Sequence, residues 1–174
     1  MATVVLSNEF MQSMATEEAW KELSGNFNWL ETTLEKYQDK VDWDEISRNY
    51  NIRWTIPMIQ KFQKKINWDV FSDNADENIL TEKYLEAFKE KWNWHNLSNN
   101  GRIEFTEELL ERFADKWDWT EIIDRYGCNL YDKKAIDFYE KYKEYIPASK
   151  LQNTYLWRDI VEQRAKQLAI EITA

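Results

Sequence analysis

Aromatic and apolar residues recur along this chain with a period of about 25 residues. Each period begins at an aromatic residue, here called the anchor, and successive anchors are separated by 23, 25, 26, 25 and 26 residues. A single globular core imposes no such period, whereas a stack of similar supersecondary units does. The pattern therefore predicts tandem repeats, and their anchors are Trp20, Trp43, Trp68, Trp94, Trp119 and Tyr145.

Each unit divides into two predicted helices, a short one that begins at the anchor and a long one that follows. In the fourth unit Leu110, Phe113 and Trp117 fall on one helical face. Thr106 precedes this stripe and can accept a hydrogen bond from a free amide of the first turn. We expect long helices near 8–19, 30–41, 56–66, 82–92, 107–117, 133–143 and 157–170, and short helices that start near 43, 68, 94, 119 and 146.

Polar residues recur at the predicted helix ends. Asp42 and Asp118 each precede an anchor and have a glutamate three residues further on, which is the spacing of a capping box. A serine four residues after the anchor supplies a small hydrogen-bonding side chain at the end of the short helix. An asparagine two residues later tolerates the left-handed conformation that closes a helix. The long-helix caps are Ser7, Thr55, Thr81, Thr106 and Asp132; the serines are Ser24, Ser47, Ser72, Ser98 and Ser149; the asparagines are Asn26, Asn49, Asn74 and Asn100.

These patterns predict an all-α protein, an α-solenoid of about six short/long helix-pair repeats that forms one domain over residues 1–174. Only 3 glycines and 2 prolines are present, too few for the many turns of a β-sandwich or barrel. Both end units are degenerate, as expected where a stack meets solvent. We expect Trp43, Trp68 and Trp94 to pack into the core.

Charge narrows the range of partners. The chain has 32 acidic and 23 basic residues, a net charge of −9. Such a surface repels nucleic acid and anionic membranes and favours basic partners. An acidity that serves only solubility is an equally good reading. The N-terminus has no secretory signal pattern and no stretch is apolar enough to span a bilayer, so we expect a cytoplasmic protein.

Residues that carry chemistry are scarce. His95 is the only histidine and Cys128 the only cysteine, so a Cys/His zinc site lacks ligands and we expect no metal. His95 follows an anchor at a solvated first-turn position, which Asp44 occupies in another unit. Cys128 is expected to be a small buried hydrophobe without a base to activate it. Because no glycine-rich phosphate loop is present either, we expect no cofactor and no enzymatic activity.

The string W-x-x-L-S-x-N, followed by a Thr-capped helix that ends in F-x-x-K-W-x-W, resembles tandem repeats of uncharacterised bacterial and phage proteins. The resemblance runs from about Ser7 to Ala174 and is clearest in WNWHNLSNN and WDWTEII. Ile123 and Arg125 depart from it by replacing the serine and the asparagine. The resemblance implies a non-enzymatic helical array and assigns no functional residue. Size and charge add an analogy to phage inhibitors of host nucleases, including anti-CRISPR proteins.

We therefore predict a protein-interaction module that places an acidic surface against a basic partner. Its most specific form is an inhibitor of a nucleic-acid-binding effector in the host cytoplasm, such as a CRISPR nuclease or its RNA-guided complex. Carboxylates that lie off the apolar stripes of two successive long helices would carry the contact. They are Glu82, Glu86, Glu90, Glu107, Glu108, Glu111 and Asp115.

Two alternatives from other classes stay open. A carbohydrate-binding module would use exposed aromatic residues, and Trp29 and Trp54 stand outside the anchor positions. A nucleic-acid-binding module would use basic residues that cluster in two units. These are Arg48, Arg53, Lys61, Lys64 and Lys65 in one unit and Lys133, Lys134, Lys141 and Lys143 in a later one.

Overall fold

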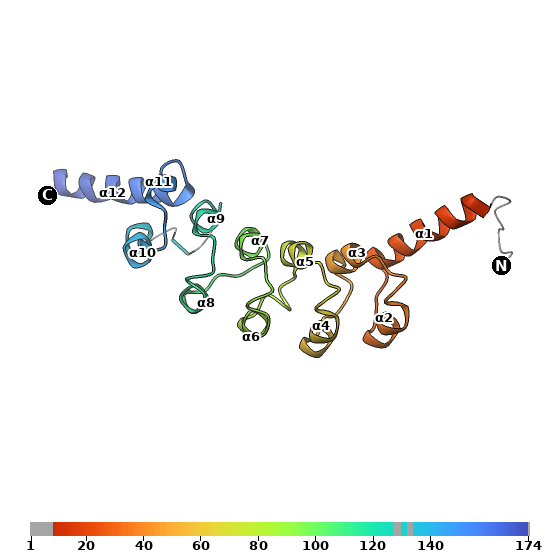
Figure 1. The fold of residues 1–174 in the computed structure, drawn as a ribbon. Helices are drawn as coiled ribbons and strands as arrows, with labels where there is room; N and C mark the ends of the chain where they lie inside the picture. Colours follow the sequence, from red (N-terminus) through yellow and green to blue (C-terminus); the bar gives the residue numbers. More distant parts are fainter. Residues whose placement is uncertain (1–8, 127–129, 132–133, 174) are drawn as a thin grey trace. The chain divides into compact units, whose positions relative to one another are not determined.

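The computed structural model describes residues 9–126, 130–131 and 134–173. All regular secondary structure in these residues is helical, which confirms the all-α prediction, and the helices recur at regular spacing as in a repeat array (Figure 1). In chain order the helices of the described residues form six successive pairs. The predictions made for Ser7, Cys128, Asp132 and Lys133 lie outside the described residues.

The contacts between residues divide the chain into two compact units, Met1–Trp92 and Asn93–Ala174. The prediction that the whole chain acts as one domain stays a prediction. The first unit contains α1 (Glu9–Asn26), α2 (Glu31–Tyr37), α3 (Trp43–Arg48), α4 (Ile56–Phe62), α5 (Trp68–Asn74) and α6 (Glu82–Ala87). The second contains α7 (Trp94–Asn99), α8 (Glu107–Arg112), α9 (Trp119–Ile123), α10 (Ala135–Tyr142), α11 (Ala148–Leu151) and α12 (Tyr155–Thr173).

The second helix of each inner pair is shorter than the sequence pattern predicted. Helices α2 and α4 have 7 residues and α6 and α8 have 6, and turns fill the rest of the way to the next anchor. At the end of the second helix, the indole of the next anchor donates a hydrogen bond to a backbone carbonyl. The Nε1 of Trp43 donates to the carbonyl of Gln38 at 2.9 Å, and Trp68 donates to Gln63 at 3.0 Å. These indole bonds satisfy carbonyls that a helix end leaves free.

The last repeat has a different register from the one predicted. Its first helix, α11, begins at Ala148, three residues after the predicted anchor Tyr145. Buried Tyr142 and Ile146 take the places that Phe62 and Ile66 hold in an inner unit, because the hydrogen bond from the Ile146 amide to the Tyr142 carbonyl repeats the one from Ile66 to Phe62. Tyr145 is exposed and stacks on Trp119, with ring centroids 5.5 Å apart.

The first repeat also departs from the prediction. A single continuous helix, α1, covers both the expected long helix near 8–19 and the short helix that starts at the anchor Trp20. Every residue from 9 to 19 is exposed, so only the part of α1 that begins near Trp20 packs as a repeat helix. The Trp20 ring lies against the ring of Tyr37 of α2, with their centroids 5.5 Å apart.

Apolar residues at fixed distances from the anchor form the core. The residue three positions after the anchor is fully or almost fully buried in the inner units, as Ile46, Phe71 and Ile122 show. The anchor indoles themselves are half-buried at positions 43, 68 and 94 and buried at 119. Each indole lies against an aromatic ring in the second helix or at its C-cap; the ring centroids of Trp43 and Phe62, for example, are 5.4 Å apart. These ring contacts increase the apolar area that the pair buries.

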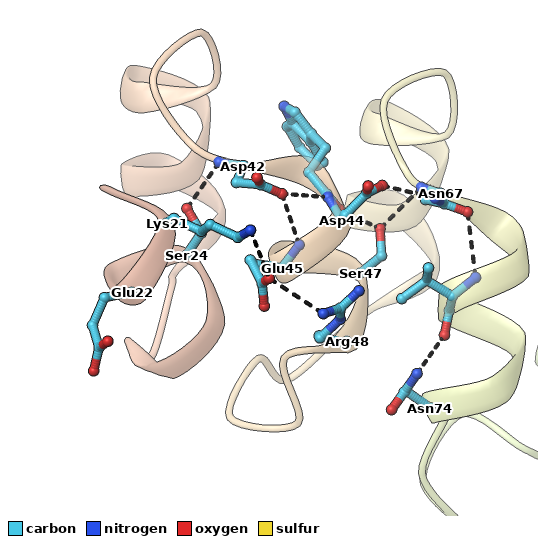
Figure 2. A network of polar contacts seen from close by, with 12 residues as sticks. Lys21, Glu22, Ser24, Asp42, Asp44, Glu45, Ser47, Arg48, Asn67 and Asn74 are labelled. Atoms are coloured by element: carbon cyan, nitrogen blue, oxygen red, sulfur yellow. Dashed lines mark hydrogen bonds and ion pairs between the residues drawn. The ribbon is translucent and has the colours of Figure 1, made fainter. Parts of the chain in front are cut away.

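In three repeats the serine four residues after the anchor joins its repeat to the next one. The Ser47 hydroxyl donates to the Trp43 carbonyl at 2.6 Å. It also accepts from the backbone N–H of Asn67, the N-cap of α5 in the next repeat, at 2.9 Å (Figure 2). Ser24 does the same with Asp42 and Ser98 with Asp118. The serine was expected only to close its own helix; it also supplies a hydrogen bond between repeats.

The asparagine six residues after the anchor acts through its side chain. Asn49 and Asn100 are in extended conformations, with φ of −75° and −62°, so the predicted left-handed helix end is wrong. The Asn49 amide instead donates to the Ser24 carbonyl of the preceding repeat at 2.7 Å. In the fifth unit Arg125 takes this position, and its guanidinium donates to the Ser98 carbonyl at 2.8 Å. The departure at Arg125 therefore preserves the contact between repeats.

Side-chain caps fix where most helices begin. Asp42 accepts from the amides of two first-turn residues of α3, and Asp118 accepts from an amide of α9. Thr55 and Thr106 cap α4 and α8 in the same way. Thr81 stands at the predicted position before α6, but its side chain makes no capping bond. The caps inferred from the sequence thus place the starts of α3, α4, α8 and α9 correctly, whereas α10 begins at Ala135, after Lys134.

Removal of the serine bridge should destabilise the protein. Ser47→Ala leaves the Asn67 amide and the Trp43 carbonyl without their hydroxyl partner, which should cost about 1–3 kcal/mol of unfolding free energy. Ser149→Ala is the matched control, because Ser149 is exposed, and should change stability by less than about 0.5 kcal/mol. Urea unfolding measures both, and equal small effects would contradict the structural role of the bridge.

Candidate protein-binding surface

The seven carboxylates predicted to contact a partner are all exposed. They lie on the second helices and the turns that follow them, in two groups that belong to different units. Glu82, Glu86 and Glu90 are in and after α6 of the first unit, where Glu86 lies 3.9 Å from Lys89. The four of the second unit are Glu107, Glu108, Glu111 and Asp115.

Two of the four carboxylates in the second unit hold a cation of the same unit. The Lys141 ammonium of α10 lies 2.6 Å from the Glu111 carboxylate and 2.9 Å from that of Glu107. Hydrogen bonds that Lys141 donates to Glu111 and Glu107 raise the pKa of Lys141, and the bond from Lys141 lowers the pKa of Glu107. Glu107 and Glu111 therefore join α8 to α10, which leaves them less available to a partner.

In the first compact unit, a lysine likewise joins the helices α2 and α4. The Lys61 ammonium of α4 lies 2.7 Å from Glu35 and 3.2 Å from Glu31 of α2, and these two bonds raise the pKa of Lys61. Lys65 lies 3.0 Å from Asp39. Ion pairs of this kind are partly exposed and each contributes little to stability, but they decide which charges remain unpaired.

Three exposed carboxylates around α8 have no such cation. Within the described part of the chain, no ion pair involves Glu104, Glu108 or Asp115. Glu108 lies in α8, and Asp115 lies in the turn that follows it. The helical spacing predicted Glu108 and Asp115 as contact residues but not Glu104, because Glu104 precedes the helix. These three carboxylates, here called the open acidic cluster, are the strongest candidates for a contact.

The basic residues considered for nucleic-acid binding are mostly paired with carboxylates. Besides Lys61, Lys65 and Lys141, Arg48 lies 3.2 Å from Glu45, and Lys143 lies 2.9 Å from Glu140. A phosphate backbone would have to compete with these carboxylates for each cation. The described residues thus favour a role for these cations within the fold.

The aromatic residues considered for carbohydrate binding are part of the core. Trp29 is only 5% exposed and Trp54 only 7%. The Trp29 indole donates to the Leu23 carbonyl at 3.1 Å, and Trp54 packs edge-on against Phe71. Neither ring offers a face on which a sugar could stack. Trp157 of α12 is the exception among the tryptophans outside the repeat pattern, since it is 37% exposed.

His95 lies at the contact between α7 and α9. Its Nδ1 is 2.8 Å from Oδ2 of Asp118 and 4.0 Å from Oε1 of Glu121. The hydrogen bond to Asp118 raises the pKa of His95. Burial would raise the pKa of Asp118, but hydrogen bonds from His95 and from the Thr120 amide lower it below its usual value.

His95 was predicted to lie in solvent, and its two carboxylate neighbours were not predicted. Its period offered the signal, because His95 precedes Asp118 by the same 23 residues that separate Asp44 from Asn67. Those two side chains are hydrogen-bonded at 2.7 Å. A residue after one anchor therefore meets the N-cap of the next repeat. This rule brings together the only group of three metal-ligating side chains found among the described residues.

None of the described helices combines the length and the apolar character that a membrane span requires. Comparison of the chain with protein-family models, with curated proteins and with solved structures finds no match. The candidate surface therefore depends on geometry and charge alone, and the resemblance to bacterial and phage repeats stays a prediction.

The His95–Asp118 pair predicts a pH dependence of stability. A histidine whose pKa is higher in the folded state contributes stability that is fully present below its unfolded pKa of about 6.5 and is lost as the pH rises through the folded value. The unfolding free energy should therefore fall as the pH rises above the unfolded pKa of about 6.5 and through the higher folded pKa. In His95→Gln this part of the slope should disappear, as urea unfolding at several pH values can measure; an unchanged slope would contradict the pairing.

Proposed function

We propose that this protein is a non-catalytic interaction module that binds a basic partner protein through the open acidic cluster. The observation that carries the proposal is the contrast within one helix and its flanks. Glu107 and Glu111 are held by Lys141, whereas Glu104, Glu108 and Asp115 are exposed and pair with no cation among the described residues. A cationic surface would gain ion pairs with these three side chains without breaking one that the fold already uses.

Charge complementarity explains what such a surface would do. An acidic protein meets a cationic patch faster than a neutral one does, and it repels acidic competitors. The net charge of −9 supplies the long-range part of this effect. Exposed carboxylates supply the short-range part, and both weaken as salt shortens the screening length.

In its most specific form, the proposal makes the partner a nucleic-acid-binding effector whose cationic cleft the acidic surface occupies. A cleft that binds the phosphate backbone presents lysine and arginine side chains, and an array of exposed carboxylates matches that chemistry. A host nuclease such as a CRISPR effector, alone or as its RNA-guided complex, fits this description. The protein would then compete with nucleic acid for the cleft in the cytoplasm.

The first step of the test is to identify the partner. Affinity purification of the tagged full-length protein from its native host, followed by mass spectrometry, supplies candidates, and each is then purified and tested directly. The proposal expects a basic protein whose binding weakens when salt is raised from about 50 to about 500 mM. An acidic partner or salt-independent binding would contradict it.

The second step compares two variants with the same change in net charge. Glu108→Lys with Asp115→Lys reverses two of the three carboxylates of the open acidic cluster, and Glu17→Lys with Glu18→Lys reverses two exposed carboxylates on α1. The first pair should weaken binding about tenfold or more, because each favourable pair becomes a repulsion, while the second should have a much smaller effect. Surface plasmon resonance measures both. Equal losses would show that net charge alone matters and would reject the cluster as the contact.

A further inference from the structure

Three potential metal ligands meet where α7 packs against α9. His95 Nδ1, Asp118 Oδ2 and a Glu121 carboxylate oxygen all lie within 4.8 Å of one another. The imidazole comes from one repeat and the two carboxylates from the next, in the same compact unit. The three side chains are 59%, 33% and 31% exposed, so an ion from solvent can reach them and water can complete its coordination.

The role of Asp118 as an N-cap does not compete with metal binding. Its Oδ1 accepts from the Thr120 amide at 3.0 Å, and its other oxygen, Oδ2, faces His95. One oxygen thus fixes the carboxylate on α9 while the other is directed at the imidazole. Held ligand atoms of this kind lower the cost of ordering a metal site.

An equivalent contact in the first unit already holds a cation. There Asp42 and Glu45 occupy the positions of Asp118 and Glu121, and the Lys21 ammonium from the preceding repeat lies 3.9 Å from Glu45 (Figure 2). At this contact a lysine of one repeat thus lies beside a carboxylate of the next repeat. At the α7–α9 contact the lysine is replaced by His95, whose neutral imidazole supplies a lone pair and no charge of its own.

We propose that a divalent transition-metal ion of the zinc type binds at this contact, with His95, Asp118 and Glu121 as ligands. Imidazole with carboxylates is a ligand set that zinc accepts, whereas magnesium and calcium prefer oxygen ligands alone. The ion takes the place of the lysine charge in the first unit. It binds the deprotonated Nδ1, so any proton held there is released to solvent. The site would join the fourth and fifth repeats independently of the proposed acidic contact.

The test uses the full-length protein and two variants of His95. Wild type titrated with zinc chloride in a non-chelating buffer at about pH 7.5 should show one saturable site by calorimetry. His95→Lys recreates the Lys21 arrangement, so it keeps the charge pairing and removes the ligand. Loss of outer-shell partners already costs 10–100-fold in metal affinity, so this variant should bind zinc at least about tenfold more weakly. His95→Gln serves as a second variant without the added charge.

Two further readouts separate this site from adventitious surface binding. Zinc should shift the His95 ring resonances in the NMR spectrum and raise the melting temperature of wild type, whereas magnesium at the same concentration should do neither. Zinc should leave the melting temperature of His95→Lys unchanged. Equal zinc affinity in wild type and His95→Lys, an unshifted His95 ring, or the lack of a saturable site would overturn the proposal. Each of these results would leave the trio as an ion pair only.

Discussion

Three contacts between repeats depend on a hydrogen bond that passes through one small hydroxyl. A unit of about 25 residues with two short helices cannot bury its apolar face alone, so neighbouring units must cover it. The Ser47 hydroxyl bonds the end of its own helix and the N-cap amide of the next repeat, and Ser24 and Ser98 repeat this bond. Because a serine is small and both donates and accepts, it lets two helices approach while the polar backbone groups between them remain satisfied.

The same stacking decides which surface charges are available. It brings Lys141 to Glu107 and Glu111, and so leaves Glu108 and Asp115 open to a partner. It also brings His95 to the two carboxylates of the next repeat. Neither outcome follows from one repeat alone, because each needs side chains from two consecutive repeats. The functional proposals are therefore consequences of how the repeats pack, and they stand on contacts made inside a single compact unit.

The period, the helical class and most caps were predictable, because each depends on residues close together in sequence. The structure confirms Thr106 and Asp42 as caps. Helix lengths were not predictable, since an apolar stripe continues through turns that the anchor indoles stabilise. The Tyr145 anchor was wrong because an aromatic residue alone does not fix the register when buried residues shift by three. For the candidate site, exposure followed from helical spacing, but the pairing of Glu107 with Lys141 and of His95 with Asp118 required the contact between repeats.

Amide hydrogen exchange of the N-cap residues measures directly whether the serine bridge holds the repeats together. The backbone N–H groups of Asp42, Asn67 and Asp118 precede their helices and have no partner within them, so their protection reports the serine bridge. The account predicts that all three exchange as slowly as the amides of the neighbouring buried helix residues Ile46, Phe71 and Ile122, because the bridge opens only when the repeats separate. Exchange at the rate of an unstructured peptide, with the helix amides still protected, would contradict it.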